Sequence, residues 1–244
     1  MKHRWLKAEL HSHCNLDPAD YRFINYSPEV LVAEAARLGY EVLAITCHNL
    51  DIWSRELAEY AGSLGITLIP GMEVTVEKRY HTLVYNFRTG SENLDRFDKI
   101  RGLATEDTLV IAPHPFFPAR TCLRGQLARN LDVYDAVESS GFYLSWADFN
   151  GPAVRLARKH GKPVVGNGDV HCLWQLGKTF TWIYSLPDIQ SILTAVKRGQ
   201  VRIETQPLDA EQVAGWWINA LGHFVFPCNP SPRRLVGTEV TVSD

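Results

Sequence analysis

The feature that most constrains the fold is the alternation of short apolar segments with amphipathic helical segments along most of the chain. The segments Ala8–Leu10, Val42–Thr46 and Thr67–Ile69 are short and apolar, as buried strands are. Helical patterns that begin at Ser27 and Ser54 separate them, and serine is a favoured residue at a helix N-terminus. This order of elements is typical of parallel βαβ units, in which each helix connects two neighbouring strands.

The alternation continues through the rest of the chain and predicts a barrel. Further strands are expected at Val74–Val76, His81–Tyr85, Leu109–Ala112, Ala136–Val137, Val164–Gly166 and Phe180–Ile183. About seven βα units result, which is near the number that closes a parallel barrel. The 244 residues fit one domain, with a less regular C-terminal part from about Val201 that holds a final helix over Asp209–Leu221 and an extended tail. We therefore predict a single α/β domain over residues 1–244.

The charge and hydropathy of the chain limit its partners. The formal net charge is −2, so no broad positive surface is expected to gather extended nucleic acid, and only a short oligonucleotide stays open as a partner of that kind. The N-terminal segment lacks the continuous apolar region of a secretory signal, and no run approaches the roughly 18 apolar residues of a membrane span. We expect a cytoplasmic protein without a membrane partner. Its oligomeric state is left open.

Histidines and acidic residues gather where the predicted strands end. They are His11, His13, His48, Glu73, His114, Asp169 and His171, joined by His81 from a predicted hairpin. In a parallel barrel the carboxyl ends of the strands meet at one rim, so residues distant in sequence are expected to converge there. Neutral imidazole and carboxylate are the donors that suit Zn²⁺, Mn²⁺ or Fe. The pattern predicts a metal centre at this rim.

Five sequence blocks in order resemble those of the PHP family, named for its polymerase and histidinol phosphatase members. The blocks are Leu10-His11-Ser12-His13, Leu43-Ala44-Ile45-Thr46-Cys47-His48-Asn49, Ile69-Pro70-Gly71-Met72-Glu73 followed by His81, Ala112-Pro113-His114-Pro115, and Gly168-Asp169-Val170-His171. Together they span about residues 8–185. The resemblance implies a distorted (β/α)7 TIM-like barrel that holds two or three divalent metal ions.

The resemblance also implies how the ligands are shared among the metals. The first metal would be held by His11, His13, Glu73 and Asp169. The second would be held by Glu73, which bridges, with His81 and His114. The third would use His48, His171 and a carboxylate of the first loop, for which we favour Asp17. The chain departs from the family here, because the loop acid usually lies seven or eight residues after the first histidine, whereas Asp17 lies six after it and Asp20 nine. Cys47 also stands where many relatives carry Asp.

The activity implied by the resemblance is hydrolysis of phosphate esters. A hydroxide shared by two metals would attack phosphorus, and Glu73, His114 and Asp169 are the predicted catalytic residues. Arg22, Arg120, Arg124 and Lys178 are candidates for contact with the phosphate, although each is as readily explained as a surface residue. Glu138 is expected to orient a ligating histidine. The expected substrate is a small phosphomonoester or a nucleotide-type compound.

Two alternative functions remain at this point. One is an exonuclease or a phosphodiesterase for cyclic phosphates, which also occur in the family. The other, of a different class, is a catalytically inactive metal-binding regulatory module. Metal content together with hydrolysis of a phosphate panel would distinguish them.

Overall fold

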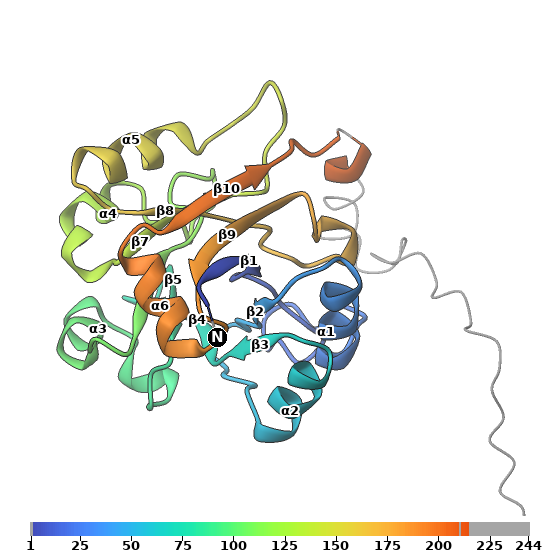
Figure 1. Cartoon of the computed structure of the whole chain (residues 1–244). Helices are drawn as coiled ribbons and strands as arrows, with labels where there is room; N and C mark the ends of the chain where they lie inside the picture. The colour runs from blue at the N-terminus through green and yellow to red at the C-terminus, as the bar shows by residue number, and fades with distance from the viewer. Residues whose placement is uncertain (1, 210, 215–244) are drawn as a thin grey trace, which may run out of the picture.

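The computed structural model describes residues 2–209 and 211–214, and its strands form two sheets of five (Figure 1). The first sheet contains, in spatial order, β10 (Val201–Thr205), β9 (Thr179–Ser185), β1 (Arg4–Glu9), β2 (Val42–Ala44) and β3 (Thr67–Ile69). The second contains β4 (Gly71–Val76), β5 (Tyr80–Tyr85), β6 (Leu109–Ala112), β7 (Ala136–Ser140) and β8 (Val164–Asn167).

Helices connect many of these strands. They are α1 (Pro28–Arg37), α2 (Arg55–Ser63), α3 (Phe97–Leu103), α4 (Gly125–Arg129), α5 (Gly151–Lys159) and α6 (Ile189–Lys197), with short 3-10 turns η1 (Ser91–Asn93), η2 (Leu131–Val133) and η3 (Leu173–Gln175). Ser27 and Ser54 cap α1 and α2 through their side chains, as the sequence predicts, and Asp188 caps α6 in the same way. Each cap satisfies a backbone N–H that the helix itself leaves without a partner.

The predicted (β/α)7 barrel is wrong, because the described residues form two mixed sheets and no single closed barrel. Strands β1, β2 and β3 pair in parallel, and so do β6, β7 and β8. In contrast, β9 runs antiparallel to both β1 and β10, and β5 runs antiparallel to both β4 and β6. The alternation of strand and helix therefore holds for two parallel blocks only.

The local reason for the difference lies between residues 69 and 85. Only Pro70 separates β3 from β4, so no helix crosses over between them. Strands β4 and β5 are joined by a tight turn in which Glu77 and Lys78 both have positive φ, the conformation that favours an antiparallel hairpin. At the start of β4, a Cβ on Gly71 would lie 2.8 Å from Cδ1 of Tyr85, so glycine permits the close approach of the two strands.

The C-terminal part contains a strand that the sequence pattern missed. Strand β10 pairs with β9 along its whole length and closes that edge of the first sheet. Residues 211–214 are helical, in the region where a final helix was expected. The remainder of that helix, including Trp216 and Trp217, and the extended segment Pro227–Pro232 lie outside the described residues. No helix in the described part is both long and apolar enough to cross a membrane.

The two sheets meet at the ends of their parallel strands. One isolated bridge joins Ser12, just after β1, to Val170, just after β8. A second joins His48, after β2, to Glu73 in β4. Both bridges connect one sheet to the other, because β1 and β2 belong to the first sheet and β4 and β8 to the second. The two-sheet fold thus still gathers the strand ends, and the histidine-rich segments with them, at one place.

Candidate metal centre

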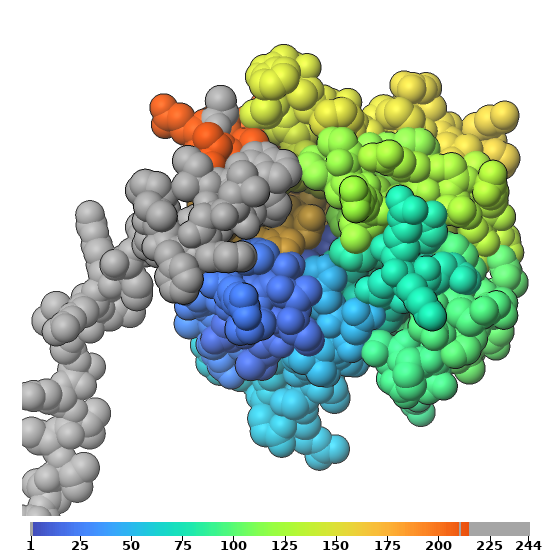
Figure 2. Space-filling view, turned by 180° about the vertical axis from the view of Figure 1, so that it is seen from behind, coloured from blue at the N-terminus to red at the C-terminus, as the bar shows by residue number. Residues whose placement is uncertain are grey.

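The structure brings together all the side chains that the sequence placed at strand ends. His11 and His13 follow β1, His48 follows β2, Glu73 lies in β4, His81 in β5, His114 follows β6, and Asp169 and His171 follow β8. Six of these eight line a cavity of about 380 Å³: His48, Glu73, His81, His114, Asp169 and His171. In Figure 2 the molecular surface is hollowed where blue N-terminal, green central and gold later segments meet. The nature of these residues as ligands stays a prediction, but their convergence is a fact of the fold.

Four separations between imidazole nitrogens and carboxylate oxygens fall in the range expected between two ligands of one metal ion. His11 Nε2 lies 3.3 Å from Glu73 Oε2 and 3.2 Å from Asp169 Oδ1. His13 Nε2 lies 3.5 Å and 3.4 Å from the same two oxygens. A cation with bonds of about 2.0–2.1 Å in tetrahedral geometry separates its ligands by roughly 3.3–3.4 Å. We call these four residues the inner set.

One buried nitrogen of the inner set lacks a hydrogen bond. His13 Nε2 has no hydrogen-bond partner among the described residues, although its ring is fully buried and faces two carboxylates. A buried polar atom without a partner is costly and calls for an explanation such as an ion. A cation between His13, Glu73 and Asp169 would satisfy this nitrogen, so the residues present fit a metal.

The second oxygen of Glu73 faces a further pair of imidazoles. His81 Nδ1 lies 2.9 Å and His114 Nε2 3.2 Å from Glu73 Oε1. Because Oε2 of the same carboxylate belongs to the inner set, Glu73 has the geometry of a group shared between two cations. The predicted bridging role of Glu73 matches this placement of its two oxygens.

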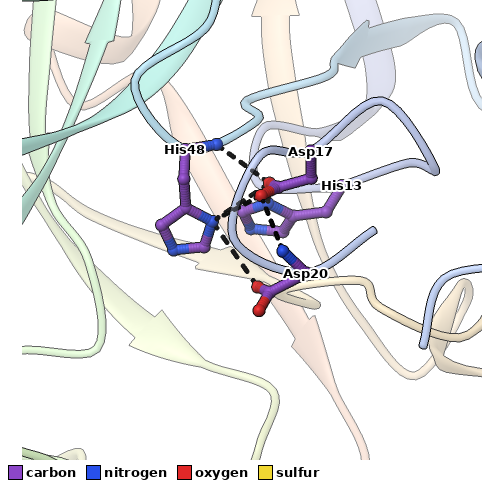
Figure 3. Close-up of side chains that lie close together, drawn as sticks. All are labelled: His13, Asp17, Asp20 and His48. Carbon is purple, nitrogen blue, oxygen red and sulfur yellow. Dashed lines mark hydrogen bonds and ion pairs between the residues drawn. The ribbon is translucent and has the colours of Figure 1, made fainter. Parts of the chain in front are cut away.

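Figure 3 shows the two acids of the first loop, Asp17 and Asp20, together with His13 and His48. The Asp17 carboxylate is fully buried and bonded on several sides: it accepts from the backbone N–H of His48 (2.9 Å) and of Ala19 (2.8 Å), and lies 2.7 Å from His13 Nδ1. Asp20 instead lines the cavity, with Oδ2 at 2.9 Å from His171 Nε2 and 3.5 Å from His48 Nδ1.

These contacts favour Asp20 over Asp17 as the loop ligand. Asp17 holds the loop and also the His13 and His48 rings, with its Oδ2 at 3.0 Å from His48 Nδ1, while Asp20 is part-exposed and lines the cavity beside His171. Spacing along the chain could not decide between the two, because the loop 15–26 folds back on itself. The N–H of Asn15, for example, donates to the carbonyl of Tyr26. We define the outer set as Asp20, His48 and His171.

Glu138 contacts His11, one of the histidines that the sequence predicts as ligands, and its orienting role stays a prediction. Its Oε2 lies 2.9 Å from His11 Nδ1 and accepts from the Asn167 amide at 3.0 Å, and its Oε1 accepts from the backbone N–H of His114 at 3.0 Å. Holding Nδ1 of His11 in this way turns Nε2 of that ring toward the inner set. One buried carboxylate thus positions residues that follow two different strands.

Glu9 is a second buried acid beneath the site, and the sequence analysis missed it. Its carboxylate accepts from the backbone N–H of His11 and of Gly168, both at 2.9 Å. Burial, partly offset by these hydrogen bonds, raises the pKa of Glu9 to about 8. An acid between Ala8 and Leu10, in a segment predicted as a short apolar strand, was the available signal. The contacts tie the segment after β1 to the segment after β8.

The charges of the site depend on one another. Burial works against ionisation of Glu73, but the facing imidazoles of His81, His11 and His48 hold its pKa well below the usual range. Burial would lower the pKa of His171, but Asp169 and Asp20 raise it to about 9. Without an ion, protons on the imidazoles therefore balance the carboxylates. Divalent cations would replace those protons.

The backbone at the site is held in an uncommon conformation. His114, Asp169 and Asn49 have positive φ, at 28°, 49° and 54° respectively, although none of them is glycine. Such conformations cost free energy and persist where the surrounding structure imposes them, often at functional sites. Two of these three residues are predicted ligands, so the strain lies where the chain turns from a strand end into the cavity.

The predicted phosphate-binding cations lie elsewhere. Arg22 is exposed and donates to the Tyr21 hydroxyl at 3.1 Å, and Arg120 and Arg124 are also exposed. Lys178 is half-buried next to β9. None of the four is among the described residues that line the cavity. Their contact with substrate stays a prediction, and the described lining offers no Lys or Arg side chain.

Cys47, which departs from the family pattern, points away from the cavity. Its Sγ lies 3.5 Å from Sγ of Cys14, and both side chains are buried in an apolar cluster with Leu43 and Ile45. The contribution of Cys47 near the site comes from its carbonyl, which accepts from the N–H of Glu73 at 3.3 Å. The departure therefore leaves the ligand atoms undisturbed.

A cluster of facing imidazoles and carboxylates on this scale defines a class of protein, one with side chains that could hold a metal ion. Residues 147–201 match the family model described as PHP-associated. Asp169 and His171 lie within the matched segment. The matched segment covers less than half of the chain, and it agrees with the resemblance to the PHP family that the sequence blocks carry.

Two solved structures share the fold at low sequence identity. PsfC from Pseudomonas syringae is 17% identical, with a TM-score of 0.55, over 91% of this chain and 98% of that one. An amidohydrolase from Chromobacterium violaceum, with bound sulfate and no metal, is 16% identical, with a TM-score of 0.53, over 84% of this chain and 99% of that one. These likenesses show a common fold. No curated protein matches the chain significantly.

Proposed function

We propose that the protein is a metal-dependent hydrolase that cleaves small phosphate esters. The observation that carries the proposal is the inner set, whose two imidazole nitrogens each lie 3.2–3.5 Å from the Glu73 and Asp169 oxygens and include a buried nitrogen without a hydrogen bond. A purely structural cluster of this kind would bury charge for no gain, because burying ionisable groups is costly unless they are paired or bind an ion. The resemblance to the PHP family points to the same chemistry.

The chain's own residues would divide the work of the site. The inner set would hold one ion, and Glu73 with His81 and His114 a second, while the outer set would hold a third through Asp20 rather than Asp17. Zn²⁺, Mn²⁺ or Fe suits these donors. When bound, such ions lower the pKa of water and neutralise charge on phosphoryl oxygens. Glu138 and Asp17 would keep the His11 and His13 rings oriented toward the ions.

The size and lining of the cavity support a small substrate. Its volume of about 380 Å³ lies at the lower end of the range for small-molecule sites. The net charge of −2 provides no extended positive track for a polymer. The Chromobacterium structure contains sulfate, a tetrahedral oxyanion like a phosphate group. A small phosphomonoester, or a nucleotide-type compound, is therefore the proposed substrate.

The test combines metal content with turnover. The full chain would be loaded with Mn²⁺, its metal content measured by mass spectrometry, and hydrolysis of 4-nitrophenyl phosphate and bis(4-nitrophenyl) phosphate followed. Two or three ions per chain with turnover of the monoester is the expected result. Turnover of the diester alone would favour the exonuclease or cyclic-phosphate alternative.

Occupied metal sites without turnover of any phosphate or amide substrate would favour the other class, a metal-binding regulatory module. Glu34 provides a surface control, because it lies on α1, pairs with the exposed Arg37 and is not part of the cavity lining. Glu34→Gln should retain both metal content and activity. Loss of activity in that variant would show that the assay reports stability of the fold rather than the site.

A further inference from the structure

Asn49 and Thr75 form a hydrogen-bonded pair in the lining of the cavity. Thr75 belongs to β4, and Asn49 lies in the segment after β2. The backbone N–H of Asn49 donates to the carbonyl of Glu73 at 2.9 Å, and its side-chain Oδ1 accepts from the backbone N–H of Thr75 at 2.8 Å. Asn49 is therefore fixed to β4 at two points, through its backbone and through its side chain.

The contacts of Asn49 determine the role of the Thr75 hydroxyl. The end of the amide that faces the N–H of Thr75 must be the oxygen, since only the oxygen can accept, so the other end is Nδ2. Nδ2 donates to Thr75 Oγ1 at 3.1 Å, which makes the hydroxyl oxygen the acceptor in this bond. Oγ1 makes no other hydrogen bond to a residue that the structure describes. The single hydroxyl proton of Thr75 is therefore left to donate to a group in the cavity.

Thr75 lies on the same face of β4 as the shared carboxylate of Glu73. Side chains two apart on a strand point to the same side, and two residues span about 6.5–7 Å along the strand. Across the ladder, Thr75 is directly opposite His81, whose Nδ1 lies 2.9 Å from Glu73 Oε1. An anion that binds beside Glu73 and His81 therefore comes within reach of the Thr75 hydroxyl.

The charge of the lining makes a neutral donor valuable at this place. None of the described residues that line the cavity is Lys or Arg, so the oxygens of a bound phosphate that do not contact metal ions must receive hydrogen bonds from uncharged groups. Thr121 and Ser140 also contribute hydroxyls to the lining, but they lie outside β4. Thr75 is the hydroxyl residue placed on the strand face that holds Glu73.

We propose that Thr75 binds the substrate, with its hydroxyl donating a hydrogen bond to a non-bridging oxygen of the phosphate group. This inference rests on the proposed function for the position of the phosphate at the metal centre. Asn49 keeps the hydroxyl oxygen occupied as an acceptor, so that the proton is directed to the ligand. A hydrogen bond to a charged oxygen is stronger than one to a neutral acceptor, and Thr75 contributes to binding without taking part in proton transfer.

Two substitutions at Thr75 separate the hydroxyl from the space that it fills. The Mn²⁺-loaded full chain would be titrated by calorimetry with inorganic phosphate. Thr75→Val replaces the hydroxyl by a methyl group and should weaken phosphate binding about tenfold or more, whereas Thr75→Ser keeps the donor and should stay within about threefold. With 4-nitrophenyl phosphate, Thr75→Val should raise KM by a similar factor and change kcat much less. Metal content should be the same in all three proteins.

Thr67→Val is the matched control. Thr67 lies in β3 and donates its hydroxyl hydrogen to the carbonyl of Pro187 at 3.2 Å, but it is not part of the lining. This variant should keep the phosphate affinity of the unaltered protein, whatever its melting temperature. Equal phosphate affinity in Thr75→Val and the unaltered protein would overturn the inference, and so would an equal loss in Thr75→Ser or in Thr67→Val. Loss of a bound Mn²⁺ ion in Thr75→Val would overturn it too, because Thr75 would then support His81 and not the anion.

The same measurements distinguish failure of this inference from failure of the proposed function. A protein that hydrolyses phosphate esters but shows no effect of Thr75→Val keeps the function and loses the role of Thr75. A protein that binds phosphate more weakly after Thr75→Val, yet hydrolyses no phosphate ester, keeps the hydroxyl contact and loses the function. If the unaltered, metal-loaded protein bound no phosphate, Thr75 would have no anion to contact and the inference would be wrong.

Discussion

The inner and outer sets of the candidate metal centre differ in how firmly the fold holds them. In the inner set, the side chains of His11, His13 and Glu73 are at most 1% exposed, and only Asp169, at 21%, reaches the surface of the cavity. In the outer set, all three side chains are 9–19% exposed. The inner set follows or lies in strands of both sheets, whereas the acid of the outer set comes from a loop.

The difference extends to what supports each set. Glu138 and Asn167, both fully buried, form a hydrogen-bonded support behind His11. Asp20 is held through its backbone, whose N–H donates to Asp17 Oδ1 at 3.1 Å, while its carboxylate faces the two imidazoles of its own set. Ligands that are pre-organised lose little freedom on binding an ion. We infer that the inner position binds first and most tightly, and that the outer position is filled last.

Glu73→Gln should have the largest effect, because it removes the negative charge that the inner set shares with His81 and His114. The amide would also place N–H groups opposite imidazole nitrogens that need an acceptor or a cation. We expect loss of at least one bound ion and a fall in turnover of about a thousandfold or more. Metal analysis by mass spectrometry and steady-state kinetics measure both.

Circular dichroism and thermal melting of Glu73→Gln would show whether the fold persists. Because five imidazoles lie within 3.5 Å of this carboxylate, some loss of stability is expected together with a native spectrum. Unchanged metal content and turnover in a folded variant would show that Glu73 is not shared between two ions.

Asp20→Asn should weaken the outer position while leaving the inner one intact. Loss of a full negative charge beside a dication is expected to lower affinity for the last ion on the order of a hundredfold. The matched variant is Asp17→Asn, which should disturb the His13 ring and the loop and therefore affect the inner position as well. Titration with Mn²⁺, resolved into successive equivalents, distinguishes the two. If Asp17→Asn alone removed the last equivalent, the assignment of Asp20 would be wrong.

Glu138→Gln should lower the affinity of the inner position by about ten- to a hundredfold, the range seen when a group that orients a metal-bound histidine is changed. The amide keeps the size of the side chain and part of its hydrogen bonding to His114 and Asn167. The affinity of the outer position for its metal ion should change little. Competition with a chelator of known affinity gives the dissociation constant of the metal ion at the inner position. An unchanged constant would show that Glu138 does not orient His11 for metal binding.

The sequence could predict the residues of the inner set but could not choose the acid of the outer set. Strand periodicity singles out the predicted inner residues in the sequence: His11 and His13 are two apart after β1, and Glu73 comes shortly after the apolar segment Thr67–Ile69. The acid of the outer set could not be fixed, since the loop between β1 and α1 turns back on itself and spacing does not report where Asp17 and Asp20 point. Their hydrogen bonds are the basis on which we propose Asp20.

The closed barrel failed as a prediction for a related reason. Short apolar strands look alike in either direction, so the sequence cannot show that β9 runs antiparallel to β1 or that β4 and β5 form a hairpin. The Val201–Thr205 strand was missed because its exposed positions break the apolar pattern. The strand ends meet nevertheless, through the bridges Ser12–Val170 and His48–Glu73.

Raising the pH should increase the affinity of the outer set for its metal ion by about tenfold per pH unit, because one proton must leave for each ion that binds there. The pKa of His171 is about 9 without an ion, so its imidazole holds a proton at neutral pH that a cation must displace. Affinity for the last equivalent of Mn²⁺ should therefore rise from about pH 7 to about pH 9 and then level off.

The stability of the chelator-treated, metal-free protein should depend on pH with the opposite sign. The raised pKa of His171 stabilises the fold below its unfolded value of about 6.5, and that contribution is lost as pH rises through about 9. Melting temperatures with and without Mn²⁺ should diverge across this range.

Cys47→Ala should have the smallest effect, and it tests whether the departure from the family pattern matters for the site. The thiol contacts Cys14 in an apolar cluster, and the cavity side of the segment is formed by the backbone and by His48. We expect metal content and turnover within about twofold of the unaltered protein, with a loss of stability of about 1 kcal/mol from the small void. A variant that lost its last metal equivalent while keeping its melting temperature would show that the Cys47 side chain, and not only its carbonyl, helps to hold His48 in the outer set.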